Sequence, residues 1–152
     1  MAETVAVIRT LALALWVGGM AALDFIEAPL RFTSGVIDRN QAVGLGQVVI
    51  TRWIRAEWAL GVLVLITSII AASPRWWVWL AVAMLAVVTV QGAVLAPAIT
   101  RLASGLDFVQ RVPGDARYTS IRHLHTAYAI LELVVLAAGA VVLAASARPA
   151  TR

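Results

Sequence analysis

The stretch from Trp76 to Thr100 contains no charged residue in 25 positions. A run of about 20 apolar residues is long enough to cross a bilayer as an α-helix. Three further segments have the same character, so we expect four spans at about residues 8–30, 55–73, 76–100 and 121–147. The chain is 62% hydrophobic and leaves no length for a soluble domain. We therefore predict one all-α domain over residues 1–152, an integral membrane bundle of four transmembrane helices.

The basic residues predict how this bundle is oriented. All twelve are arginines, and eight of them lie on the side of the first and third connections, against four on the other side. Because cytoplasmic loops carry the excess of positive charge, we expect both termini outside, in a bacterial cytoplasmic membrane. The same placement of arginines on the cytoplasmic side accounts for the high isoelectric point, so nucleic-acid binding is not needed to explain it. Cysteine is absent, which excludes disulfides and thiolate metal sites.

The two halves of the sequence resemble each other. The first span ends in Ala28-Pro29 and the third in Ala96-Pro97, while the following spans open with Ile54-Arg55 and Ile121-Arg122. An offset of two spans preserves orientation, so the pattern is compatible with two repeated helical hairpins. Residues 40–53 before the second span fit either a short interfacial helix or an early start of that span.

Small and aromatic residues suggest where the helices meet each other and the membrane surface. Ala14, Gly18 and Ala22 form a ridge at four-residue spacing, which predicts a close approach to another helix. Gly18 and Gly19 could alternatively leave room for a bulky neighbour or a ligand. The Trp76-Trp77-Val78-Trp79 segment follows a tight turn at residues 73–75 and is typical of an interfacial aromatic belt.

Glu132 is the most unusual polar residue, because it stands alone in an apolar stretch near mid-membrane. A carboxylate at that depth costs several kcal/mol unless it is protonated, paired or in a wet interior. His125 and Tyr128 share its helical stripe, whereas His123 points about 200° away from His125. We expect this stripe to face the bundle interior, with Gln91, Tyr128 or His125 as partner of Glu132.

Two interpretations of the remaining polar residues stay open. Asp24 and Glu27 lie near the cytoplasmic end of the first span. With Glu57, they could form an ion-paired cap with the arginines at the helix ends, Arg52, Arg55, Arg101 and Arg122. Alternatively they belong to a polar pocket that opens to the cytoplasm, with Gln91 and Glu132 as its floor and His125, Tyr128 and Glu27 in its walls. Such a pocket could bind a cation or carry protons.

Two stretches, LALALWVGGMAALDFIEAPLRF and IRHLHTAYAILELVVL, resemble a known family. They are similar to uncharacterised bacterial four-helix proteins related to human transmembrane protein 205 and, more distantly, to the copper resistance D domain. The resemblance implies a four-span bundle and a loose link to metal or drug tolerance, and it fixes no chemistry. The family-like positions, of unknown role, are Trp16, Gly18, Gly19, Pro29, Phe32 and His125.

Three classes of function follow from these patterns. The first is a non-enzymatic membrane protein, either free-standing or an accessory subunit of a larger membrane complex, with lipid and other membrane subunits as partners. The second handles metal ions or protons, with His125 as the candidate metal ligand. The third is a haem- or quinone-associated oxidoreductase, for which His125 is the one well-placed axial ligand. The first helix lacks the His that a protoporphyrinogen oxidase-like haem site would need. No catalytic motif is present, so the sequence favours a protein that is not an enzyme and names no substrate.

Overall fold

A computed structural model describes residues 2–146, which fold entirely into helices and connections. The helical elements are α1 (Ala2–Ala22), η1 (Leu23–Glu27), α2 (Ala28–Thr33), α3 (Arg39–Ile70), α4 (Arg75–Val90), η2 (Gln91–Leu95), α5 (Ala96–Ala103) and α6 (Ala116–Ser146). Because consecutive elements run on without a break, four long helices result: Glu3–Thr33, Arg39–Ile70, Arg75–Ala103 and Ala116–Ser146. Each is long and apolar enough to cross a membrane. The predicted all-α four-helix membrane bundle is confirmed.

The second long helix begins at Arg39, before the predicted span, because two reciprocal hydrogen bonds cap its N-terminus. The Asp38 carboxylate accepts a hydrogen bond from the Gln41 backbone N–H at 2.8 Å, and the Gln41 side chain accepts one from the Asp38 N–H at 3.0 Å. This capping box satisfies two backbone donors that a helix start leaves free. Of the two alternatives for residues 40–53, the early start of the span is therefore correct.

Each half contains one π turn, and each π turn is followed directly by Ala-Pro. In η1 the Ala28 N–H bonds to the carbonyl of Leu23, and in η2 the Ala96 N–H bonds to that of Gln91. The following residues, Pro29 and Pro97, have no N–H and crowd the carbonyl four residues earlier, which favours a wider turn. The two π turns occur at equivalent positions of the two halves, which supports the predicted repeat of hairpins.

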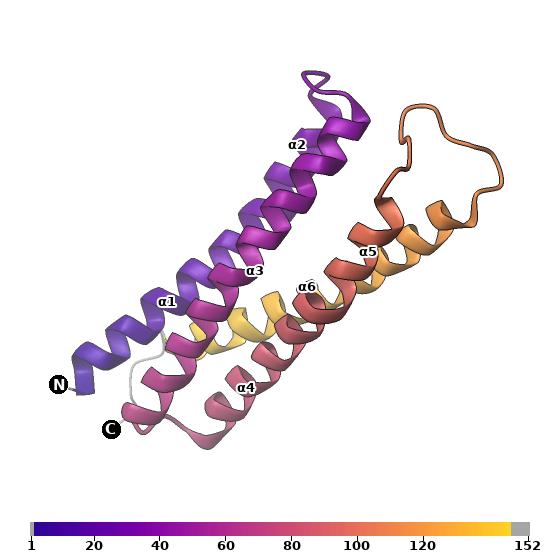
Figure 1. The fold of residues 1–152 in the computed structure, drawn as a ribbon. Coiled ribbons are helices and arrows are strands. Elements are labelled where there is room, and N and C mark those ends of the chain that lie inside the picture. Colours follow the sequence, from indigo (N-terminus) through magenta and orange to yellow (C-terminus); the bar gives the residue numbers. More distant parts are fainter. Residues whose placement is uncertain (1, 147–152) are drawn as a thin grey trace.

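Figure 1 shows the arrangement of the four long helices. The first two form one hairpin and the last two another; α1 packs on α3 and α6, and α3 packs on α4. The core lies where the hairpins meet, and its fully buried side chains include Trp16, Leu13, Met20, Val88 and Val135. Toward α2 and α5 the two hairpins separate in this view, at the end away from the N-terminus (Figure 1).

Two sequence interpretations of helix surfaces need correction. Ala14, Gly18 and Ala22 are all exposed, so their ridge contacts no helix within residues 2–146. The close approach occurs one residue later, where a Cβ on Gly19 would lie 2.1 Å from the ring of Trp53. The prediction of a bulky neighbour beside this glycine pair is correct for Gly19.

The tryptophan belt is also only partly as predicted. Trp76 and Trp79 are exposed, but Trp77 is buried with the Arg9 guanidinium 4.3 Å from its ring centroid. Arg9 also donates a hydrogen bond to the Ser73 hydroxyl in the α3–α4 connection. Arg9 therefore ties the first helix to this turn, and Trp77 belongs to the packed core because it covers that arginine.

Candidate functional site

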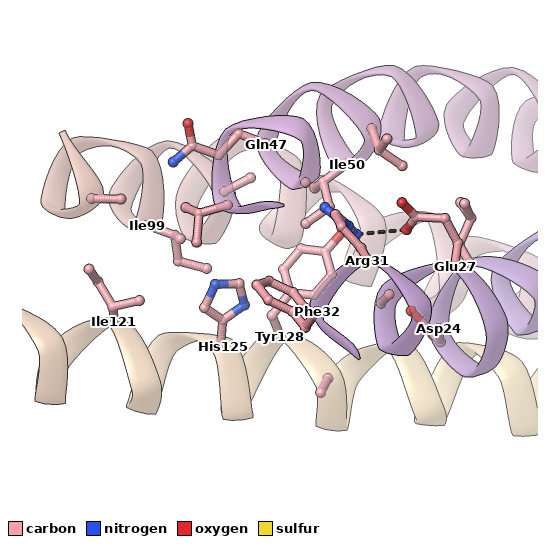
Figure 2. A pocket seen from close by; sticks show the side chains of 18 of the residues that line it. Asp24, Glu27, Arg31, Phe32, Gln47, Ile50, Ile99, Ile121, His125 and Tyr128 are labelled. Carbon is pink, nitrogen blue, oxygen red and sulfur yellow. Dashed lines mark hydrogen bonds and ion pairs between the residues drawn. The ribbon is translucent and has the colours of Figure 1, made fainter. Parts of the chain in front are cut away.

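A pocket of about 550 Å³ lies between the two hairpins, at the end where they separate. Its walls come from η1 and α2 on one side, from the first turns of α3, and from α5 and α6 on the other. Most of the lining is apolar, which is typical of small-molecule sites, as is its volume. Figure 2 shows six polar side chains that line this space: Asp24, Glu27, Arg31, Gln47, His125 and Tyr128.

Glu132 lies at the inner end of this pocket. Glu132 is 7% exposed and lies on the same face of α6 as His125 and Tyr128, which also line the pocket. Asp24 reaches the pocket from η1 on the opposite hairpin (Figure 2). Within residues 2–146, neither carboxylate forms an ion pair or a side-chain hydrogen bond. The floor of the pocket is therefore acidic and has no internal counter-charge in the described part of the chain.

Glu57 adds a third carboxylate near this floor. It is 1% exposed, and Trp16 Nε1 donates a hydrogen bond to its Oε1 at 3.1 Å. Its other oxygen, Oε2, is buried and has no hydrogen-bond partner among the described residues. The carboxylates of Asp24 and Glu57 both lie within electrostatic range of Glu132. Three acidic groups from three helices thus surround the bundle interior at this depth.

The role of Glu57 was missed by the sequence interpretation, which paired it with an arginine at a helix end. That interpretation took Arg55 as the start of the helix. A helix that begins at Arg39 places residue 57 five turns inside, since one turn takes about 3.6 residues. The Asp38–Gln41 capping signal was the clue that would have located Glu57 correctly.

The mouth of the pocket carries an ion pair. Arg31 donates a hydrogen bond to the Glu27 carboxylate at 2.6 Å, one helical turn away (Figure 2). Arg31 also reaches the carbonyl of Ala42 at 3.4 Å, and a Cβ on Gly46 would collide with its guanidinium. Among residues 2–146 this pair and Asp115–Arg117 are the two ion pairs. The proposed cap with Arg52, Arg55, Arg101 and Arg122 is therefore wrong.

Gln91 takes a different place from the one expected. It is 1% exposed, and its Nε2 donates to the backbone carbonyl of Tyr128 at 3.3 Å. This bond holds η2 against α6 just below the pocket, and Gln91 is not part of the lining. Gln91 therefore supports the floor of the pocket from below and does not pair with Glu132.

The two histidines differ as the helical spacing predicts. His125 enters the pocket (Figure 2), whereas His123 does not line it. In residues 2–146 there is no group of three or more His, Asp or Glu side chains arranged to hold a metal ion.

The family-like positions have distinct places in the structure. Trp16 holds Glu57, and Gly19 makes room for Trp53. Pro29 follows the first π turn, and Phe32 lines the pocket. Gly18 is exposed on the outer face.

The chain is thus an integral membrane protein of the four-helix class with a pocket between its hairpins. Residues 11–105 match the model of a family described as a domain of unknown function (DUF4149), and the chain belongs to this family. The match includes both π turns and ends before α6, so Glu132, His125 and Tyr128 lie outside it. No curated protein and no solved structure matches the chain. The relation to transmembrane protein 205 and to the copper resistance D domain stays a prediction.

Proposed function

We propose that this protein is a non-enzymatic membrane protein that binds a cation with an apolar body in the pocket between its hairpins. The observation that carries the proposal is the acidic floor: Asp24 and Glu132 both line a mostly apolar space, and neither has a basic partner in residues 2–146. A buried carboxylate without a counter-charge is costly. A bound cation, or a proton in its absence, removes that cost.

The side chains in the pocket walls also suit a cation with an apolar body. Phe32 and Tyr128 are aromatic rings at the pocket surface, and aromatic faces attract organic cations. Arg31 is held by Glu27, so the arginine nearest the mouth of the pocket is already paired. Arg39 and Arg111 lie further out, at the loop end of the lining. On this proposal, the ligand's apolar body fills the pocket while its charge lies at Asp24 and Glu132.

The proposal extends to location and partners. The arginine bias supports a bacterial cytoplasmic membrane with the pocket open to the cytoplasm. Proton binding by the same carboxylates is the related alternative, since cation and proton would compete for them. A role as accessory subunit stays a prediction, which the proteins that co-purify from native membranes would test. The visible spectrum and elemental analysis of the same preparation would test the haem and metal alternatives.

Tetraphenylphosphonium is a suitable probe, and tetraphenylborate is its control of matched shape and opposite charge. With the protein in phosphatidylcholine nanodiscs and empty nanodiscs subtracted, we expect saturable binding of the cation and none of the anion. Glu132→Gln and Asp24→Asn should each weaken binding about tenfold, equivalent to about 1.4 kcal/mol. Glu3→Gln, which changes an exposed carboxylate on the same helix as Asp24, should leave binding unchanged.

Thermal unfolding separates loss of binding from loss of fold. Glu132→Gln keeps the hydrogen-bonding capacity of the side chain, and Glu132→Leu removes it; both should unfold near the wild-type temperature if the carboxylate serves ligand binding. The proposal would be overturned if folded Glu132→Gln and Asp24→Asn variants bound the phosphonium as tightly as the wild type. Equal binding of the borate would also contradict it.

A further inference from the structure

A second, more open groove of about 390 Å³ lies between α3 and the η2–α5 segment. Its lining combines two arginines, two threonines and an apolar base. The full set is Thr51, Ile54, Arg55, Gly92, Ala96, Pro97, Thr100 and Arg101. This groove adjoins the inter-hairpin pocket, since Thr51, Ala96 and Thr100 line both, but it differs in charge because it contains no carboxylate.

The base of the groove is formed by the second π turn. Gly92 lies so close to α3 that a Cβ there would be 2.8 Å from the Cγ2 of Ile54. Pro97, which has no N–H to donate, follows this π turn near the start of α5. The wide turn and the small residue together bring Arg55 and Arg101, which are 46 positions apart in the sequence, to one groove.

Both arginines are available to a ligand. Arg55 and Arg101 are exposed, and within residues 2–146 neither forms an ion pair. The Thr100 hydroxyl, also exposed, makes no hydrogen bond to another described residue. Two guanidinium groups beside a free hydroxyl provide the donors that a phosphate group accepts. The positive charge, without any nearby acid in the groove, selects an anion.

The depth of the groove identifies the source of that anion. Arg55 lies 15 residues before Ile70, the end of α3, which is about 22 Å along a helix. Arg101 follows the charge-free stretch from Trp76 to Thr100, which is long enough to cross the hydrocarbon core. Arg101 therefore marks the boundary between hydrocarbon and headgroups, and the long Arg55 side chain, which starts inside the hydrocarbon core of about 30 Å, extends toward the headgroups in the same groove. Ile54, Ala96 and Pro97 form the apolar base of the groove, against which an acyl chain of the lipid can pack.

We propose that Arg55 and Arg101, with Thr100, form a binding site for the phosphate of an anionic phospholipid. Basic pockets between transmembrane helices are known to hold acidic headgroups. This inference does not rest on cation binding in the inter-hairpin pocket: Thr100 lines both spaces, but the charged residues of the two sites are different.

Native mass spectrometry of the delipidated protein tests this site directly. We expect phosphatidylglycerol to bind in preference to phosphatidylcholine, and Arg55→Gln or Arg101→Gln to weaken that binding about fivefold each. Arg52→Gln is the matched control, since Arg52 is an exposed arginine of α3 that does not line the groove. The control variant should bind phosphatidylglycerol as the wild type does.

Three results would overturn the proposal. Equal binding of the two lipids would show that the groove does not select charge. An equal loss in Arg52→Gln would mean that the lipid responds to the basic surface in general. Displacement of phosphatidylglycerol by inorganic phosphate at low millimolar concentration would make the ligand a soluble anion. Thermal unfolding of each variant in detergent identifies any that is misfolded, and Arg55→Lys, which keeps the charge, should then retain most of the binding.

Discussion

At the residue scale, the polar side chains of the interior depend on close fits to bulky neighbours. Glu57 is held by the Trp16 indole, and that indole lies beside Gly61, where a Cβ would be 2.9 Å from its ring. Gly19 makes the same kind of room for Trp53. Two glycines on adjacent helices therefore accommodate two tryptophans next to a buried carboxylate. In a close-packed interior, one added methyl group at such a position must displace the ring.

Gly19→Ala should destabilise the protein by about 1–3 kcal/mol, because its Cβ would overlap the Trp53 ring. Gly18→Ala is the matched control, since a Cβ at Gly18 meets no atom within 4 Å. Thermal unfolding in detergent, followed by tryptophan fluorescence, measures both. Equal unfolding temperatures for the two variants would contradict the packing described for Gly19.

At the element scale, the connection from residue 104 to 115 closes the loop end of the pocket by contact with the start of α3. The Asn40 side chain donates to the Asp107 carboxylate at 3.0 Å and accepts from the Phe108 N–H at 2.6 Å. The same carboxylate accepts the backbone N–H groups of Val109 and Gln110. Because Phe108 and Arg111 line the pocket, this network positions part of its wall.

The loop contact should weaken in acid. The Gln110 backbone N–H, the Asn40 side chain and the Val109 N–H hold the pKa of Asp107 below its usual range. The contribution of Asp107 is therefore fully present above the ordinary pKa of an aspartate, about 3.9, and is lost as the pH falls through the lowered value. Protection of the Val109 and Gln110 amides against hydrogen exchange, corrected for intrinsic rates, should fall in that range.

Asn40→Ala should lower the protection of the Phe108 amide at neutral pH, because its acceptor is removed. Gln110→Ala is the control: the Gln110 backbone N–H remains, and its side chain makes no hydrogen bond within the described residues. Unchanged exchange of Phe108 in Asn40→Ala would show that the loop is held by other contacts, such as the Tyr118 hydroxyl on the Asp107 carbonyl.

At the scale of the whole molecule, the two hairpins share one packed core and separate at the loop end. Arg9 and the α3–α4 turn hold the opposite end together, whereas the ion pair at the mouth lies within one hairpin. Across the loop end, the hairpins are joined by the contacts of Asn40 with Asp107 and Phe108, and the pocket lies between the hairpins there. The connections at residues 34–38 and 104–115 both lie on the pocket's side of the bundle, with Arg31, Arg39, Arg101, Arg111 and Arg117 in or beside them (Figure 1).

The arginine distribution predicts that this side is cytoplasmic. A cytoplasmic reporter fused near Gly114 should be active, and the same reporter fused after Arg152 should be inactive, because the first lies in an arginine-rich connection and the second beyond the fourth span. The reverse pattern would place the pocket on the outside and would require a different ligand source.

The sequence alone determined the fold class, because long apolar stretches must satisfy every backbone hydrogen bond inside a bilayer as helices. It also determined that His125, Tyr128 and Glu132 share a face, since helical periodicity fixes that stripe. Packing between helices decided the rest. The first π turn contains Asp24 and Glu27, which both line the pocket, and the depth of Glu57 follows from where α3 begins. Whether Gly18 or Gly19 faces a neighbour depends on the rotation of α1, which contacts between distant segments set and local periodicity does not.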